Sequence, residues 1–316
     1  MMLQQIRVVE KPEVYIRKAL RESRKGKKVR IRDKRSRQKQ EELQKIRIYK
    51  DVLYDEVQKV VKSFPSFENL DPFYKELIDS QIRIDDLRKE LSRLSWIRQK
   101  LLVLFRDYNS RVRGTESIIK IKSIQKEFYG RTSSLLKKSE KTFKFLENSR
   151  RTIKNFPSIK TKIKTICISG FPNVGKSTLL KKLTGANVEI QPYAFTTKSL
   201  LLGYIEKKLQ IIDTPGTLNR YNKMNSIEKQ AHLAIKYLAE KVIYVFDLTE
   251  TCGYEIEKQI ELFKKLKEEF QEKEIIIFLS KTDILKPEQV ESFITYLKDE
   301  KIFCDSEPLK AYITPP

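Results

Sequence analysis

Residues 163–177 read IKTICISGFPNVGKS, a short run rich in β-branched residues followed by a glycine turn. The turn from Gly170 to Ser177 fits the pattern GxxxxGK[ST], and a helical pattern runs from about 175 to 184. Backbone N–H groups in such a loop point inward and hold phosphate oxygens, with a helix N-terminus behind them. The stretch predicts a strand, a phosphate-binding loop and a helix; the alternative is a chance glycine turn.

This loop suits a nucleotide bound together with Mg²⁺. Lys176 would neutralise the outer phosphates, and the hydroxyl of Ser177 would bind the metal ion. The nucleotide-binding residues predicted here are Gly170, Pro172, Asn173, Val174, Gly175, Lys176, Ser177 and Thr178.

A second motif, the sequence DTPG, follows another strand-like run. The carboxylate of Asp213 can reach Mg²⁺ through water, and the N–H of Gly216 can sense a γ-phosphate. Between the two motifs, Thr197 is expected to add a hydroxyl to Mg²⁺, in preference to the adjacent Thr196. Asp213 could instead cap its strand, but its position after the phosphate loop favours the metal role. The predicted metal ligands are therefore Ser177, Thr197 and Asp213.

A third motif identifies the base. The sequence FLSKTD ends at Asp283, follows an apolar run and resembles the base-reading pattern NKxD, with Ser280 and Lys281 in its first two places. Asp283 can accept the N1 and N2 hydrogens of guanine, which adenine cannot supply. GTP and GDP are therefore the predicted ligands.

The rest of the second half alternates between strand-like and helical patterns. Strand-like runs are 199–206, 208–213, 242–248, 274–280 and 309–314, and helical patterns are 225–240, 254–272 and 287–299. This alternation predicts a mainly parallel sheet covered on both faces. Because the last strand-like run reaches the final residues, we expect the last helix of the domain to be absent.

The first half shows only helical patterns. They cover about 38–62, a long helix after Pro72, 116–128 and 132–153, with a break at Gly114-Thr115 and a linker at 156–158. Apolar residues at helical spacing in the long helix predict one buried stripe, with Trp96 in the core beside it. The stripe consists of Ile84, Leu87, Leu91, Leu94, Leu101, Phe105 and Tyr108. We expect two domains, a basic helical bundle at 1–160 and a nucleotide-binding domain at 161–316.

Positive charge is concentrated in the first half. Residues 1–160 hold 42 basic and 21 acidic side chains, against 23 and 21 in residues 161–316. Nucleic-acid phosphate is the predicted partner of the densest run, 17–37, since twelve positive charges there suit a polyanion. The alternative is a solvated basic arm that binds nothing. Binding to an anionic membrane is disfavoured because the run lacks bulky apolar residues. The predicted RNA-binding residues are Arg17, Lys18, Arg21, Arg24, Lys25, Lys27, Lys28, Arg30, Arg32, Lys34, Arg35 and Arg37.

Composition excludes several other classes. The three cysteines show no CxxC spacing, which argues against a disulfide framework or a zinc site. No stretch approaches the eighteen apolar residues of a membrane span, and the N-terminus has no long apolar core. A soluble, unexported protein of the cytoplasm is therefore expected.

Several segments resemble the nucleolar GTP-binding (Nog) family, a ribosome-assembly branch related to Obg. In the second half these are GFPNVGKSTLL, QPYAFTTKSLLLGY, IIDTPGTLNR, FDLTETCGYEIEKQIELF and LSKTDIL. In the first half they are KSFPSFENLDPFYKELID, IDDLRKELSRLSW and EFYGRTSSLLKK. The resemblance covers about residues 15–300. It implies an α/β P-loop GTPase domain preceded by an all-α bundle, and binding to the large ribosomal subunit or its precursor. It also points to a shorter, archaeal-type member. We expect the chain to be a monomer.

The chain departs from the family pattern near the base. Ser280 replaces the usual Asn, which would remove an amide that contacts the base and braces the phosphate loop. Thr314-Pro315 stands where the family has Ser-Ala after the last strand, and proline lacks the N–H that reads guanine O6.

Other departures concern catalysis. Thr217 stands where related enzymes keep a water-positioning glutamine, so intrinsic hydrolysis should be slow. Asn173 either helps to hold K⁺, as in related potassium-activated GTPases, or only stabilises the turn. The predicted catalytic residues are Lys176, Thr197, Gly216 and Asn173. His232, the only histidine, is read as a surface residue of a helix rather than a catalytic group.

These patterns lead to one main hypothesis and two alternatives. The main one is a GTP-hydrolysing switch that binds rRNA and assists assembly of the large ribosomal subunit, stimulated by the ribosome. The alternatives are a non-hydrolysing, nucleotide-bound rRNA scaffold and a ribosome-splitting GTPase of the HflX type.

Overall fold

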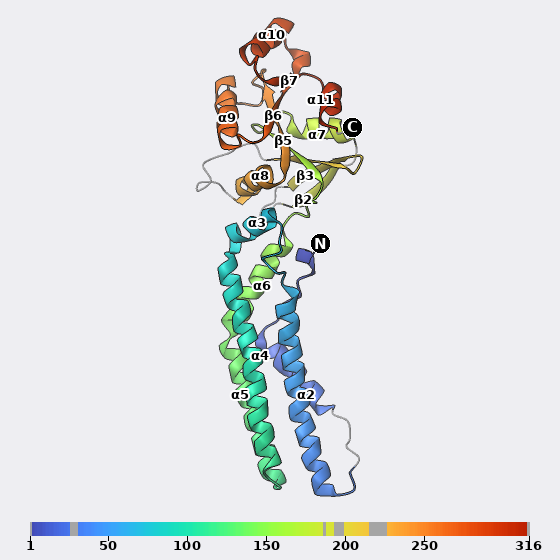
Figure 1. Cartoon of the computed structure of the whole chain (residues 1–316), viewed down its shortest axis with the longest axis vertical. Coiled ribbons are helices and arrows are strands. Elements are labelled where there is room, and N and C mark those ends of the chain that lie inside the picture. The colour runs from blue at the N-terminus through green and yellow to red at the C-terminus, as the bar shows by residue number, and fades with distance from the viewer. Residues whose placement is uncertain (1, 26–30, 186–187, 193–198, 215–225, 315–316) are drawn as a thin grey trace. The chain divides into compact units, whose positions relative to one another are not determined.

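The computed structural model describes residues 2–25, 31–185, 188–192, 199–214 and 226–314 (Figure 1). The chain forms two compact units, one of residues 1–70 and 78–154 and one of residues 71–77 and 155–316. Segment 71–77 belongs to the second unit because the buried hydroxyl of Tyr74 contacts the linker. It lies 2.9 Å from the Pro157 oxygen and accepts the N–H of Ile159 at 2.8 Å.

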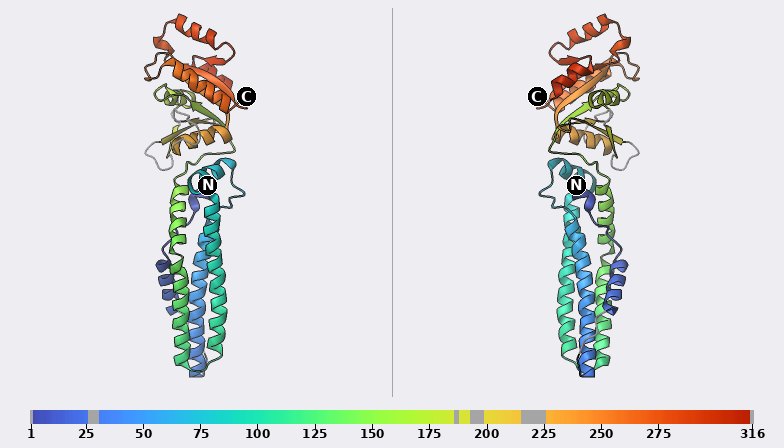
Figure 2. Two further views of the ribbon diagram at one scale, coloured as in Figure 1. Left: turned by 90° about the vertical axis from the view of Figure 1, so that its left-hand side faces the viewer. Right: turned by 90° about the vertical axis from the view of Figure 1, so that its right-hand side faces the viewer.

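The first unit is a helical bundle, as the sequence predicts. Its elements are η1 (Met2–Gln5), α1 (Pro12–Arg24), α2 (Lys34–Ser63), α4 (Ile84–Arg113), α5 (Ile118–Lys138) and α6 (Glu140–Lys154); α3 (Pro72–Ile82) spans both units. The long helices α2, α4 and α5 pack side by side, and α1 lies against α2 (Figure 2). Buried residues at helical spacing, such as Leu87, Leu94 and Leu101, give α4 one buried face.

Three details of the bundle differ from the sequence prediction. The helix after Pro72 is interrupted at Arg83, which has a φ of 57°, and the Asp79 carboxylate accepts the N–H of Ile84 at 2.8 Å. Helix α5 continues through Gly130 and ends at Lys138, so the predicted break after residue 128 is wrong. Trp96 is 53% exposed because it lies off the buried face of Leu94 and Ile97, so its predicted core position is also wrong.

The second unit is built on a seven-stranded sheet of order β2-β3-β4-β1-β5-β6-β7. The strands are β1 (Lys164–Ser169), β2 (Val188–Pro192), β3 (Ser199–Ile205), β4 (Leu209–Asp213), β5 (Ala239–Asp247), β6 (Glu274–Ser280) and β7 (Lys301–Phe303). Strand β3 is antiparallel to both its neighbours, and every other pairing is parallel. The mainly parallel sheet is therefore confirmed, and the sequence predicted neither of its two edge strands, β2 and β7.

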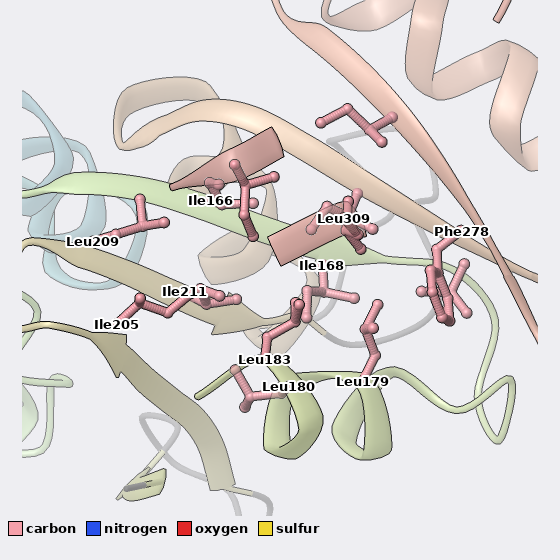
Figure 3. Close-up of a cluster of buried hydrophobic side chains, with 14 of the residues drawn as sticks. Ile166, Ile168, Leu179, Leu180, Leu183, Ile205, Leu209, Ile211, Phe278 and Leu309 are labelled. Atoms are coloured by element: carbon pink, nitrogen blue, oxygen red, sulfur yellow. The ribbon is translucent and has the colours of Figure 1, made fainter. Parts of the chain in front are cut away.

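Helices cover this sheet, and they include a last helix that the sequence prediction lacked. They are α7 (Lys176–Thr184), α8 (Ser226–Tyr237), α9 (Ile256–Glu269), α10 (Pro287–Tyr296) and α11 (Ser306–Ile313), with a 3₁₀ turn η3 (Thr282–Ile284). The expected strand at 309–314 and the expected absence of the last helix are both wrong. Leu309 and Ile313 are one helical turn apart, and both are buried in the core. Figure 3 shows Leu309 in this cluster. That core also contains Ile166 and Leu183, from β1 and α7.

Candidate nucleotide-binding site

The candidate site lies at the carboxyl ends of adjacent strands. Strand β1 ends at Ser169, and its neighbours β4 and β5 end at Asp213 and Asp247. Strand β6 ends at Ser280, which pairs with Asp247 in the register of the sheet. In open α/β sheets, ligands bind in the crevice outside this edge.

The loop between β1 and α7 has the backbone that its glycines predict. Gly170 has a φ of +133°, and a Cβ there would lie 2.6 Å from the carbonyl oxygen of Val245. Gly175 caps α7 with a φ of +102°, and Asn173 is exposed with a φ of 63°. Such left-handed positions are open to glycine and tolerated by asparagine. Only glycine at 170 allows the loop to approach β5 this closely.

Lys176 is the first residue of α7 and lies across this loop. Its ammonium donates to the carbonyl oxygens of Gly170 (3.0 Å) and Phe171 (2.7 Å), and only 8% of the residue is exposed. Burial lowers the pKa of Lys176, while the Asp213 carboxylate opposes that shift. An anionic ligand would restore the charge balance here, because a buried cation favours an opposite charge beside it.

Ser177 and Asp213 meet at the expected place for a metal ion. The Ser177 hydroxyl donates to Asp213 Oδ2 at 2.5 Å. Asp213 Oδ1 is buried without a hydrogen-bond partner among the described residues. Burial raises the pKa of Asp213, and the bond from Ser177 opposes the shift. A hydroxyl beside an unsatisfied carboxylate oxygen fits Mg²⁺, which prefers oxygen ligands. Thr197 and Gly216, also predicted here, lie outside the described residues.

The end of β6 joins the phosphate loop to the base-reading segment. Ser280 Oγ lies 2.6 Å from the Val174 oxygen and 2.9 Å from the Phe246 oxygen, so it can donate to either. The predicted loss of the brace on the phosphate loop is therefore wrong, since the serine reaches it directly. Asp283 lies exposed on η3, two residues beyond Lys281.

One group of site residues received no role from the sequence. The carboxylate of Asp247, at the end of β5, is fully buried and bonds to Lys281 at 2.6 Å. Gln259 on α9 accepts the N–H of Asp247 at 2.9 Å and donates to its carbonyl oxygen at 3.0 Å. Both residues lie in FDLTETCGYEIEKQIELF, which the sequence marked only as a family resemblance. The partners are separated by 12 and 34 residues, so no local pattern could reveal these contacts.

Two further expectations need correction. The last strand ends at Phe303, so Cys304 and Asp305 follow it, and Thr314 is instead the C-cap of α11. The argument from the missing N–H of Pro315 therefore fails, and Pro315 itself lies outside the described residues. His232 is 7% exposed rather than on the surface, and its Nε2 lies 2.7 Å from Glu269 Oε1.

The basic run from 17 to 37 is divided between two helices. Lys18 on α1 bonds to the buried Glu56 at 2.9 Å, so its charge is used within the bundle. Lys27, Lys28 and Arg30 lie outside the described residues. Exposed members of the run are Arg17, Arg21, Arg24, Lys25, Arg32, Lys34, Arg35 and Arg37. Among the helices that the structure describes, none has the length and apolar character needed to cross a membrane.

Comparison with known proteins connects these features to one family. A family model described as the NOG1 N-terminal helical domain matches residues 3–160, and a model described as nucleolar GTP-binding protein 1 matches residues 226–283. An uncharacterized protein of Methanocaldococcus jannaschii is 39% identical over 247 residues, covering 78% of this chain and 70% of that protein.

Eukaryotic relatives are longer than the matched region. Nucleolar GTP-binding protein 1 of Saccharomyces cerevisiae is 34% identical over 79% of this chain, and the match spans 39% of that protein. The Drosophila melanogaster protein of the same name is 34% identical over 81% of this chain and 41% of its own length. A crystal structure of putative nucleolar GTP-binding protein 1 from Plasmodium falciparum shares 34% identity, covering 46% of this chain and 77% of that chain, with a TM-score of 0.37.

Proposed function

Because the chain belongs to the nucleolar GTP-binding protein 1 family, we propose that it binds GTP with Mg²⁺ and hydrolyses it slowly. We further propose that it binds rRNA and assists assembly of the large ribosomal subunit. One observation carries the nucleotide part of this proposal. The buried Lys176 and the Ser177–Asp213 pair meet at the carboxyl edge of a parallel sheet, beside a glycine loop with left-handed backbone.

In this proposal the phosphate loop holds the triphosphate. The Lys176 ammonium moves from the Gly170 and Phe171 carbonyls to phosphate oxygens, which offer a charged acceptor in the same buried place. Ser177, Asp213 and Thr197 would hold Mg²⁺, which would draw charge from the phosphate oxygens. The N–H of Gly216 would sense the γ-phosphate.

The base would bind at the ends of β6 and β7. Asp283 would accept two hydrogens from guanine, and Lys281 would lie beside the ring. The segment after β7 begins at Cys304. Cys304 has a backbone N–H that could donate to guanine O6, whereas a proline has none. Ser280 supports this region through its contact with the phosphate loop rather than through the base.

Catalysis would depend on help from outside the loop. Thr217 is too short to orient water as a glutamine does, so intrinsic turnover would be slow. The ribosome, and K⁺ held near Asn173, would supply the missing electrostatic stabilisation. Thr217 also favours the second candidate, an rRNA scaffold that keeps the nucleotide without turnover.

Contact with rRNA would use the exposed cations of α1 and of the start of α2. Arg21 and Lys25 each bond to Glu22 on the surface, and such exposed pairs are weak enough to yield to phosphate. Residues 17–37 contain no aromatic side chains on which bases could stack. Recognition of RNA there would therefore depend on its shape and charge.

A competition titration tests the nucleotide part. The chain is loaded with a fluorescent GDP analogue in the presence of Mg²⁺, and GTP or ATP is added as competitor. We expect GTP to displace the probe and ATP to fail, and Lys176→Ala to abolish binding. Lys182→Ala, an exposed lysine on the same helix, is the matched control and should bind normally. Equal competition by ATP, or unchanged binding by Lys176→Ala, would refute the proposal.

A further inference from the structure

Asp247 is a buried charge that lies next to the proposed base-reading segment, residues 280–283. It ends β5, it pairs in register with Ser280 at the end of β6, and its side chain is 0% exposed. A buried carboxylate is costly unless charges and hydrogen bonds compensate it. The groups that compensate this charge therefore indicate its role.

Both oxygens of this carboxylate are fully engaged. Oδ2 receives the Lys281 ammonium at 2.6 Å, the Cys252 N–H at 2.9 Å and the Thr251 hydroxyl at 3.2 Å. Oδ1 receives the N–H and the hydroxyl of Thr249. Burial alone would raise the pKa of Asp247, but the bonds from Lys281 and Thr249 outweigh it, and the pKa is lowered. The group is thus a permanent anion at neutral pH.

The ammonium group of Lys281 has two hydrogen-bond acceptors. Besides Asp247, its ammonium donates to Thr251 Oγ1 at 2.7 Å, and its backbone is left-handed with a φ of 55°. A free lysine side chain has many rotamers, and a ligand that uses it must otherwise remove part of that entropy on binding. Fixing the ammonium in advance lowers that cost and restricts the methylene stem of Lys281, two residues before Asp283.

We propose that Asp247 is a positioning residue for the guanine site. Together with Thr251, it fixes the ammonium of Lys281 before the base binds. Positioning Lys281 is thus the proposed function of the DLTETC segment, residues 247–252. The inference rests on the proposed binding of guanine nucleotides. Because Asp247 acts at the base end and not at the γ-phosphate, its loss weakens GTP and GDP binding by the same factor.

Asp247 also shapes its own loop, so the test must separate the two roles. The design is a double-mutant cycle of Asp247→Asn and Lys281→Met, with dissociation constants for GTP and GDP measured by titration in the full chain. Each single variant should weaken both nucleotides by on the order of tenfold, and the double variant should be no weaker than Lys281→Met alone. Glu257→Gln, an exposed carboxylate on α9, is the matched control. Thermal unfolding of each variant reports any loss of the fold.

Additive losses in the cycle, or a loss confined to GTP, would overturn the inference. Should Asp247→Asn fail to fold, Thr251→Val removes one of the two acceptors of Lys281 and keeps the ion pair between Lys281 and Asp247. It should weaken GTP and GDP equally, and unchanged affinity would overturn the inference. If the wild-type chain binds no GTP, the proposed function itself fails. If the wild type binds GTP through Lys176 but the cycle is additive, only the role of Asp247 is lost.

Discussion

At the scale of single residues, the site separates into two regions with different chemistry. The phosphate region contains a buried ammonium, Lys176, beside a carboxylate with an unsatisfied oxygen, Asp213. The proposed base region contains Asp283, an exposed carboxylate on a short 3₁₀ turn. Substitutions in the two regions should therefore change different properties, affinity for phosphate in one and choice of base in the other.

Choice of base should depend on Asp283. In Asp283→Asn the amide cannot accept both guanine hydrogens, but it offers a donor to the O2 of xanthine. We expect GTP affinity to fall by about a hundredfold, as for the loss of two charge-assisted hydrogen bonds, and xanthosine triphosphate to bind better. Competition titrations measure both, with Asp299→Asn as a control on an exposed carboxylate elsewhere. Unaltered preference for GTP in Asp283→Asn would remove this residue from the base site.

Turnover should respond to the monovalent cation through Asn173. This side chain is exposed on the phosphate loop in a left-handed backbone position. Phosphate release should be faster in K⁺ than in Na⁺, and Asn173→Ala should remove the difference. Equal rates of the wild type in both salts would leave asparagine as a turn residue only.

At the scale of elements, a buried acidic residue joins helices of the bundle. Glu56 on α2 is the clearest case, because its side chain is 4% exposed and bonds to Arg7, Lys18 and Lys59. The bonds to Arg7 and Lys18 attach the N-terminal segment and α1 to α2. Since α1 carries part of the basic run, Glu56 also determines where those cations lie.

Removing that charge should loosen α1. Glu56→Gln should lower the free energy of unfolding by about 1–3 kcal/mol, measured by urea titration, with exposed Glu68→Gln as control. Burial would raise the pKa of Glu56, but Lys18, Lys59 and Arg7 lower it overall. Its contribution is therefore present above 4.5, the ordinary pKa of glutamate, and is lost as the pH falls below that value. A constant difference between wild type and variant from neutral pH to pH 3 would contradict this origin.

The elements also show what the sequence can and cannot predict. The phosphate loop was predictable because its glycines and Lys176 act within eight consecutive residues. The last helix was not, because the apolar residues around Leu309 alternate as a strand does, and only burial against β1 and α7 selects the helix. Trp96 was misplaced because bulk alone does not indicate which face of a helix is covered. The contacts of Ser280 and Asp247 bridge long separations, so they required the fold.

At the scale of the whole molecule, charge and nucleotide chemistry occupy different halves of the chain. Residues 1–160 carry a net charge of +21, the difference of 42 and 21, against +2 for the remainder. All the described nucleotide-site residues follow residue 160. We therefore propose that RNA affinity and GTP affinity can be altered separately.

Affinity for rRNA should depend steeply on salt, because each cation placed on a phosphate releases condensed counterions. If about six phosphates are engaged, the affinity should fall on the order of a thousandfold between about 50 and 200 mM salt. Reversing the exposed charges Arg17, Arg21, Arg24, Arg32, Arg35 and Arg37 should flatten this slope and leave GTP binding intact. Filter binding over a salt series measures it. An unchanged slope in that variant would place the RNA surface elsewhere.

The most direct test of a GTP-driven role on the ribosome is multiple-turnover phosphate release, measured in K⁺ and Mg²⁺ with and without purified large ribosomal subunits. We predict slow, GTP-specific release by the chain alone and stimulation by at least about tenfold when subunits are added. Lys176→Ala should show neither activity. Release that is absent under both conditions, or that proceeds equally with ATP, would contradict the proposed GTPase switch.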